Sequence, residues 1–201
     1  MRMKQKSGQG RQLCPDKELA ARIEEIKKLQ CKEVKPARSI SQKEAEKKVR
    51  LFSQIKNNRD GRIAEIPIST IGKILRHKGY DISKIFNDIT VLYEESIYGW
   101  SEPEIETSEH KPHTNITSIH HYINKFFDGN QGYYIRFTIS EEKVKQGRMG
   151  KNYIHSTAIS NTLIYENGGY SQRIRNIDPG ETNTPPPFID KRLIDFFNSV
   201  K

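Results

Sequence analysis

The segment YYIRFTISEEKVKQGRMGKNYIHSTAIS, residues 133–160, alternates apolar and polar side chains in two short runs separated by a basic loop that contains glycine. Successive side chains of a β-strand point to opposite faces of the sheet, so this alternation indicates two half-buried strands. We predict antiparallel strands at about 133–140 and 152–159, with a third strand at 162–166. The apolar face of the first strand is Tyr133, Ile135, Phe137 and Ile139.

Six other segments carry apolar residues at helical spacing. They are residues 16–30, 41–55, 69–79, 83–97, 117–127 and 188–200. Ser41 and Glu44 have the spacing of a capping box, which marks the start of the second helix. Helices followed by consecutive strands with short links predict the α+β class. We expect helices packed on one face of a small antiparallel β-sheet, preceded by a charged helical N-terminal arm.

The formal net charge of +9 is concentrated near the N-terminus, since residues 1–50 hold 15 Lys and Arg against 7 Asp and Glu. A basic arm favours a nucleic acid or another polyanion as partner, through counterion release. A solvated tail explains the charge equally well, and the two helices of the arm suit a coiled linker as readily as a core. We divide the chain into a basic, partly disordered and helical arm (1–56), a folded domain (57–170), and a loop with a C-terminal helix (171–201).

Several classes of protein are not indicated by the sequence. No apolar stretch approaches the roughly 20 residues that cross a membrane, and the first residues lack the apolar core of a secretory signal. We expect a cytoplasmic protein, or one delivered into the cytoplasm of a target cell. Cys14 and Cys31 are the only cysteines, too few for a disulfide scaffold, and without nearby histidines they predict no zinc site. No cofactor is expected.

The polar side of the two strands carries groups that suit phosphate chemistry. If the apolar face packs on the helices, Tyr134, Arg136 and Thr138 lie on the open face. The register that buries Ile154 and Ala158 adds Tyr153 and His155 to that face. A fixed cation, an imidazole, hydroxyls and aromatic rings can hold a phosphodiester, move a proton and stack a base. The alternative is an ordinary polar sheet face.

The loop between the strands contains Lys143, Lys145, Arg148 and Lys151, with no acidic residue between them. Such a loop suits phosphate contacts, and a solvated basic hairpin is the alternative reading.

The histidines give a weaker signal. His110 and His113 have H-x-x-H spacing on a predicted loop without a carboxylate partner, so we predict no metal there. His120, on a predicted helix, is expected at the surface.

Several pieces of sequence occur in a characteristic order between residues 57 and 160. They are NNRDGRIAEIPIS (57–69), IGKIL (71–75), DISKIFNDITVLYEES (81–96), EHKPH (109–113), IHHYINKFFDGNQGYYIRFTISE (119–141) and KNYIHS (151–156). In this order they resemble the nuclease-like domain of large polyvalent proteins of bacteriophages and conjugative elements. That domain belongs to the superfamily of barnase, EndoU, colicin-type ribonucleases and RelE.

The resemblance implies a metal-independent endoribonuclease of the toxin or effector type, with a domain at 57–170 that cleaves RNA on the open face of the sheet. It implies His155 and His110 as the acid and base, Arg136 and Lys73 as phosphate stabilisers, and Thr138 as an orienting hydroxyl. Attack by the ribose 2′-OH would leave a 2′,3′-cyclic phosphate. The expected partners are RNA and an immunity or antitoxin protein.

Two other hypotheses stand beside the ribonuclease. One is a non-catalytic nucleic-acid-binding module, which binds with a steep salt dependence and yields no products. The other is an interaction module of a mobile-element protein, in which the acidic run from Asp88 to Glu109, with seven acids and no Lys or Arg, binds a basic partner.

Overall fold

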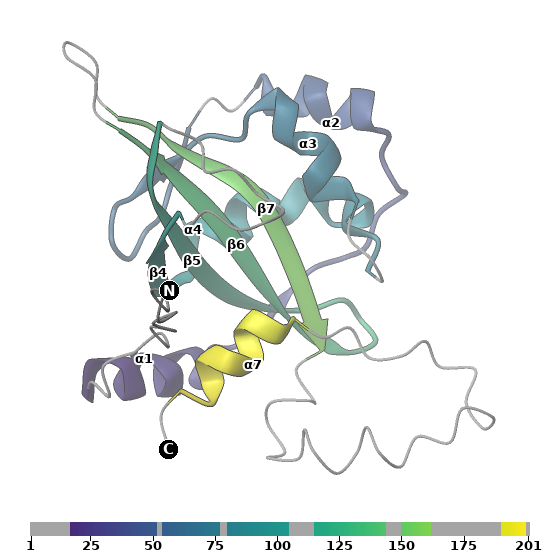
Figure 1. Cartoon of the computed structure of the whole chain (residues 1–201). Coiled ribbons are helices and arrows are strands. Elements are labelled where there is room, and N and C mark those ends of the chain that lie inside the picture. Colours follow the sequence, from purple (N-terminus) through teal and green to yellow (C-terminus); the bar gives the residue numbers. More distant parts are fainter. Residues whose placement is uncertain are drawn as a thin grey trace, which may run out of the picture.

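A mixed five-stranded sheet forms the centre of the molecule (Figure 1). The computed structural model describes residues 17–51, 54–76, 80–104, 115–143, 150–161 and 190–199. The antiparallel strands are β4 (Ile97–Pro103), β5 (Ile116–Phe127), β6 (Gly132–Glu142) and β7 (Asn152–Asn161). The short β1 (Lys32–Glu33) pairs parallel with the end of β5. The α+β class and the strands predicted at 133–140 and 152–159 are confirmed, and the third strand, at 162–166, lies outside the described residues.

The strand β5 replaces the helix predicted at 117–127, which is wrong. Ile119, Tyr122, Ile123 and Phe126 fit helical spacing, yet β5 lies inside the sheet between β4 and β6. Both faces of this strand are covered, so its side chains are buried on both sides and the alternation that marks a strand disappears. Gly129, with a φ of 91°, closes the turn into β6.

Three α-helices and two 3₁₀ turns cover one face of the sheet. They are α2 (Gln42–Val49), α3 (Ile68–Leu75), η1 (Ile82–Lys84), η2 (Phe86–Asp88) and α4 (Ile89–Glu94). Ile71, Ile85 and Leu92 from these elements pack with Phe137 and the rest of the apolar face predicted for β6. The predicted capping box at Ser41 and Glu44 is present. The helix predicted at 83–97 is broken into η2 and α4, and β4 begins at its predicted end.

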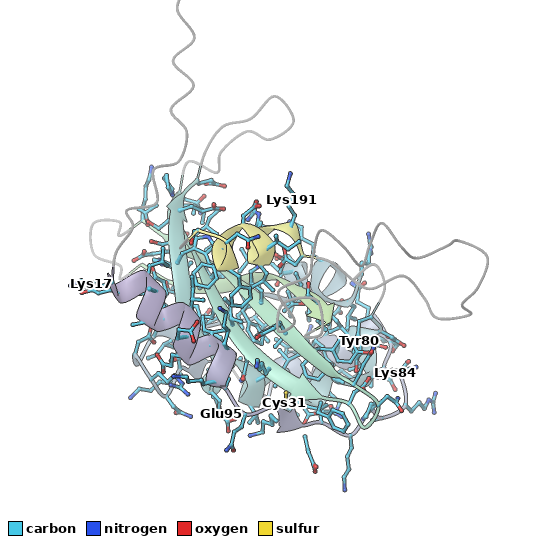
Figure 2. All side chains as sticks on the ribbon, turned by 90° about the horizontal axis from the view of Figure 1, so that it is seen from below. Lys17, Cys31, Tyr80, Lys84, Glu95 and Lys191 are labelled. Carbon is cyan, nitrogen blue, oxygen red and sulfur yellow. The ribbon has the colours of Figure 1, made fainter. Side chains whose placement is uncertain are left out.

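The other face of the sheet is covered as well, by α1 (Lys17–Lys28) and α7 (Lys191–Phe197). Figure 2 shows both helices lying across this face, with Lys17 at the start of α1 and Lys191 at the start of α7. Ile23 of α1 and Phe196 of α7 pack with Tyr134 of β6 in a second buried cluster. The face of the sheet that was expected to be open is therefore covered, and α1, the first helix of the predicted arm, is part of a core.

A short hairpin, β2 (Ile55–Lys56) with β3 (Ile63–Ala64), lies beside the start of β7. The side-chain amide of Asn57 is buried and donates to the carbonyl of Tyr93 at 2.9 Å, which fixes the hairpin to the end of α4. Gly61 has a φ of 76°, so this turn requires a residue that tolerates the left-handed region. Within the described ranges, no helix is both long and apolar enough to span a membrane.

Candidate functional site

Lys73 and His155 meet at the exposed edge of the sheet. Lys73 projects from α3, which packs on β7, and its Nζ lies 3.4 Å from Nε2 of His155. The lysine is exposed and the imidazole is half-buried. An ammonium donates hydrogen bonds and cannot accept them, so Nε2 of His155 is the acceptor in this contact. The structure thus brings together two of the predicted catalytic residues.

A β-bulge in β7 directs His155 to this position. In the pairing with β6, Ser156 lies opposite Thr138 and Ile154 lies opposite Ile139, so His155 is the extra residue between them. A bulge re-aims the side chain of the unpaired residue, which here contacts α3. Regular alternation had placed His155 on the face of Arg136. That expectation is wrong because the alternation is interrupted at His155 itself.

Two hydrogen bonds to the backbone of Ile154 hold α3 and the segment before it against the bulge. The Thr70 hydroxyl donates to the Ile154 carbonyl at 3.1 Å, and the Ile154 N–H donates to the carbonyl of Glu65 at 2.8 Å. Thr70 lies one turn before Lys73 on α3. The position of the lysine therefore depends on contacts made by the residue that precedes His155.

A cleft of about 880 Å³ lies between the β2–β3 hairpin and the start of β7, and its lining includes neither Lys73 nor His155. Its lining includes Lys143, Lys151 and Tyr153, three residues predicted to bind substrate. Lys151 pairs with Glu65 at 3.0 Å, and this hydrogen bond raises the pKa of the lysine. The Tyr153 hydroxyl donates to Glu142 at 3.3 Å. Burial, followed by the nearby Glu142 charge, raises the pKa of Tyr153. Cations, carboxylates and an aromatic ring thus line one cleft.

Arg136, Thr138 and Tyr134 lie on the opposite, α7-covered face. The Arg136 side chain is only 8% exposed; its Nε donates to Asp190 at 2.5 Å and its Nη1 to the Thr138 hydroxyl at 2.8 Å. Tyr134 is fully buried beneath Lys125, whose Nζ lies 5.1 Å from the ring centroid. The prediction that these three residues occupy an open face with His155 is wrong, because α1 and α7 cover that face.

Three predicted residues lie outside the described residues, namely His110, Lys145 and Arg148. His113 lies outside them too. Within the described parts of the chain, no group of three His, Cys, Asp or Glu side chains is placed to hold a metal ion. Two members of the predicted acidic run pair inside the chain, Glu95 with Lys32 at 2.6 Å and Glu102 with Arg192 at 3.1 Å.

A second polar cluster was missed by the sequence analysis. His120, only 7% exposed, contacts Glu141 through Nε2 at 2.8 Å, so its predicted surface position is wrong. Arg62 donates to Asn152 at 3.2 Å and lies 3.9 Å from Glu141. Asn152 also lines the cleft, which places a partly exposed guanidinium near its wall. Correct assignment of β5 as a strand would have put His120 and His121 on opposite faces.

The sequence profile of the large polyvalent protein-associated domain 3 family matches residues 34–154. The chain belongs to this family. No curated protein and no solved structure matches it. The polyvalent-protein part of the predicted resemblance is confirmed, and the link to the barnase and EndoU superfamily stays a prediction.

The polyvalent protein-associated domain, as matched, contains Lys73, the β2–β3 hairpin and the strands β4 to β6. The match ends at residue 154, directly before His155. The two helices that cover the second face, α1 and α7, lie outside the matched range. The covering of Arg136 by α7 is therefore contributed by sequence beyond the matched domain.

Proposed function

We propose that the chain is a metal-independent endoribonuclease that cleaves RNA beside Lys73 and His155. The observation that carries this proposal is the 3.4 Å approach of Lys73 Nζ to His155 Nε2 at an exposed sheet edge, two residues along β7 from Tyr153 in the cleft lining. The two groups supply a proton acceptor and a cation within the span of one phosphodiester. Two of the expected groups, Arg136 and Thr138, take no part in this scheme because they are buried.

The chemistry follows from the protonation of the pair. Neutral His155 carries its proton on Nδ1. Once the ammonium of Lys73 turns from Nε2 to the phosphate, the lone pair on Nε2 can take the proton of the ribose 2′-OH. The 2′-oxygen then forms a bond to phosphorus, and Lys73 stabilises the added negative charge. The bond from phosphorus to the 5′-oxygen breaks, leaving a 2′,3′-cyclic phosphate. The 5′-oxygen takes up a proton, for which His110 is the predicted donor.

The cleft suits the nucleotides that flank the cleaved bond. Lys143 and Lys151 provide cations for backbone phosphates, and Tyr153 provides a ring on which a base can stack. Stacking and phosphate contacts carry little sequence information by themselves. Glu65 and Glu142 in the same lining are hydrogen-bond acceptors for base amino groups.

A non-catalytic nucleic-acid-binding module is the second candidate. The burial of Arg136 and Thr138 favours it, because the exposed edge then retains fewer catalytic groups than the resemblance implies. This module would bind RNA through Lys143 and Lys151, with a steep salt dependence, and would leave the RNA intact.

The test is incubation of the purified chain with total bacterial RNA in the presence of EDTA. We expect fragments that end in 2′,3′-cyclic phosphate. His155→Ala should lower the rate by roughly 10²–10⁴-fold and Lys73→Met by roughly 10²–10³-fold. Lys84→Met, at an exposed lysine on η1, is the control and should cleave normally. Salt-dependent binding without products would select the second candidate, and cleavage that requires a metal would refute the mechanism.

A further inference from the structure

Arg136 is the centre of a buried polar cluster between the sheet and α7. Its guanidinium contacts the carboxylate of Asp190, the hydroxyl of Thr138 and Nδ1 of His121, the last at 3.0 Å. The side chains of Arg136 and Asp190 are 8% and 7% exposed, and that of His121 is fully buried. This is a cation surrounded by fixed polar groups, with one carboxylate as its anion.

The protonation of His121 leaves Arg136 as the charged group of the pair that these two residues form. A guanidinium can only donate, so Nδ1 of His121 accepts from Arg136 and the ring proton lies on Nε2. Nε2 lies 3.4 Å from Glu102, which also pairs with Arg192. Burial, the largest effect, lowers the pKa of His121 to about 4, so the ring is neutral near pH 7. Arg136 is then the positive charge that faces Asp190.

Asp190 reaches this cluster from a separate element. One carboxylate oxygen accepts from Arg136, and the other caps α7 by accepting from the N–H of Arg192 at 3.1 Å. The helix contributes Leu193 and Phe196 to the buried cluster of this face. It lies outside the range that matches the polyvalent protein-associated domain, whereas Arg136 lies inside it. The cation therefore belongs to the matched domain, and its anion comes from an appended helix.

We propose that Arg136 and Thr138 form a binding site for a phosphate or carboxylate oxyanion, in which His121 orients the guanidinium, and that Asp190 is the resident occupant of this site. The planar fork of arginine suits both oxyanions, and the Thr138 hydroxyl supplies an additional polar group. An external oxyanion that takes the place of Asp190 releases α7 from its charge partner. The proposal does not depend on ribonuclease activity, because the site lies on the other face of the sheet.

Asp190→Asn removes the negative charge of the resident side chain with little change in shape. Asparagine is as good a helix N-cap as aspartate, so α7 keeps its start while Arg136 loses its anion. The readout is the melting temperature at constant ionic strength, with chloride replaced by inorganic phosphate or, in a parallel series, by acetate. A ligand that binds only the folded state raises this temperature in a saturable manner.

Trp100 gives a second readout, because it is the only tryptophan of the chain. Its ring stacks on His121, with centroids 4.3 Å apart, and on Phe196, with centroids 4.7 Å apart. Binding at the Arg136 cluster should therefore change its fluorescence together with the melting temperature.

We expect phosphate, acetate or both to raise the melting temperature of Asp190→Asn by several degrees and that of the unaltered chain by less than one degree. The anion that acts at the lower concentration identifies the preferred oxyanion. The response should vanish when Arg136→Met is added to Asp190→Asn. An equal response in the unaltered chain, or one that survives Arg136→Met, would overturn the proposal.

The Asp190→Asn variant could be unfolded in chloride. In that case phosphate should refold it, and circular dichroism that shows this refolding supports the site. Phe196→Ala is the alternative variant, since it weakens the packing of α7 and leaves the charge pair intact. Phosphate should then shift the Trp100 emission as it competes with Asp190. Absence of any phosphate effect in both variants would show that the cluster is purely structural.

Discussion

The two sides of the sheet use their polar groups in different ways. Under α7, Arg136 is buried and bound to Asp190, His121 and Thr138. At the edge beside α3, exposed Lys73 makes a 3.4 Å contact with His155. A buried charge is held by its partners, and loss of one partner leaves the other unpaired. An exposed charge remains available to a ligand. Whether a charged group is buried or exposed is determined by the elements that cover each side of the sheet, and not by the residue type.

Arg136→Met should have the largest effect on stability. It leaves Asp190 buried without its cation, and breaking a buried pair in this way costs roughly 3–5 kcal/mol of unfolding free energy. Urea denaturation at pH 7 measures the loss. Adding Asp190→Asn, which removes the unpaired charge and keeps the helix cap, should restore part of it. A loss below about 1 kcal/mol for Arg136→Met would mean that this face is not organised around the pair.

Lowering the pH should reduce the unfolding free energy of the chain through the same buried cluster, by a comparable but smaller amount. Burial, aided by the Arg136 and Arg192 charges and opposed by Glu102, lowers the pKa of His121 to about 4 in the folded chain, from 6.5. Between these two values the unfolded chain binds more protons, so stability is lost as pH falls from 6.5 to 4. The loss from this residue is about 3 kcal/mol at 1.36 kcal/mol per pKa unit.

The measurement is the unfolding free energy at pH 7 and pH 4, for the unaltered chain and for His121→Gln. Other groups contribute to acid destabilisation in both proteins, so the difference between them isolates His121. His121→Gln should lose less stability over this interval. Equal losses in the two proteins would show that His121 is not the group responsible.

The way each strand is covered also explains how far the fold could be predicted. The apolar face of β6 packs on α2, α3 and α4, and its alternation was visible because polar residues separate the apolar ones. In β5, Ile123 and Lys125 are buried on one side while Tyr122 and Phe126 are buried on the other. A central strand covered on both faces carries no alternation, so helical spacing and strand spacing could not be distinguished there.

The site could be predicted only in part, for a related reason. Lys73 and His155 were named from an order of motifs, but their contact depends on the bulge at His155 and the packing of α3, which no residue spacing encodes. Arg136 and Thr138 were expected on an open face because the sequence gives no sign that a helix starting at residue 191 covers them. The buried position of Arg136 follows from a tertiary contact 54 residues away.

Thr70→Val should have a moderate effect, located at the α3 edge. The single hydroxyl hydrogen of Thr70 is shared between the carbonyls of Pro67 at 2.8 Å and Ile154 at 3.1 Å. Its loss should cost about 1 kcal/mol of unfolding free energy. RNA cleavage should fall as well, because α3 then holds Lys73 less firmly beside His155. Thr90→Val on α4 is the control and should leave the cleavage rate unchanged.

Lys73→Met should have the smallest effect on stability of all these changes, within about 0.5 kcal/mol, because the lysine is exposed and its contact with His155 is long. Urea denaturation and RNA cleavage, measured on the same preparation, test the comparison of the two sides directly. Preserved stability with a large loss of cleavage would show that the edge keeps its cation for a ligand. A loss of stability similar to that of Arg136→Met would show instead that Lys73 is a structural residue, and the two sides would then differ only in exposure.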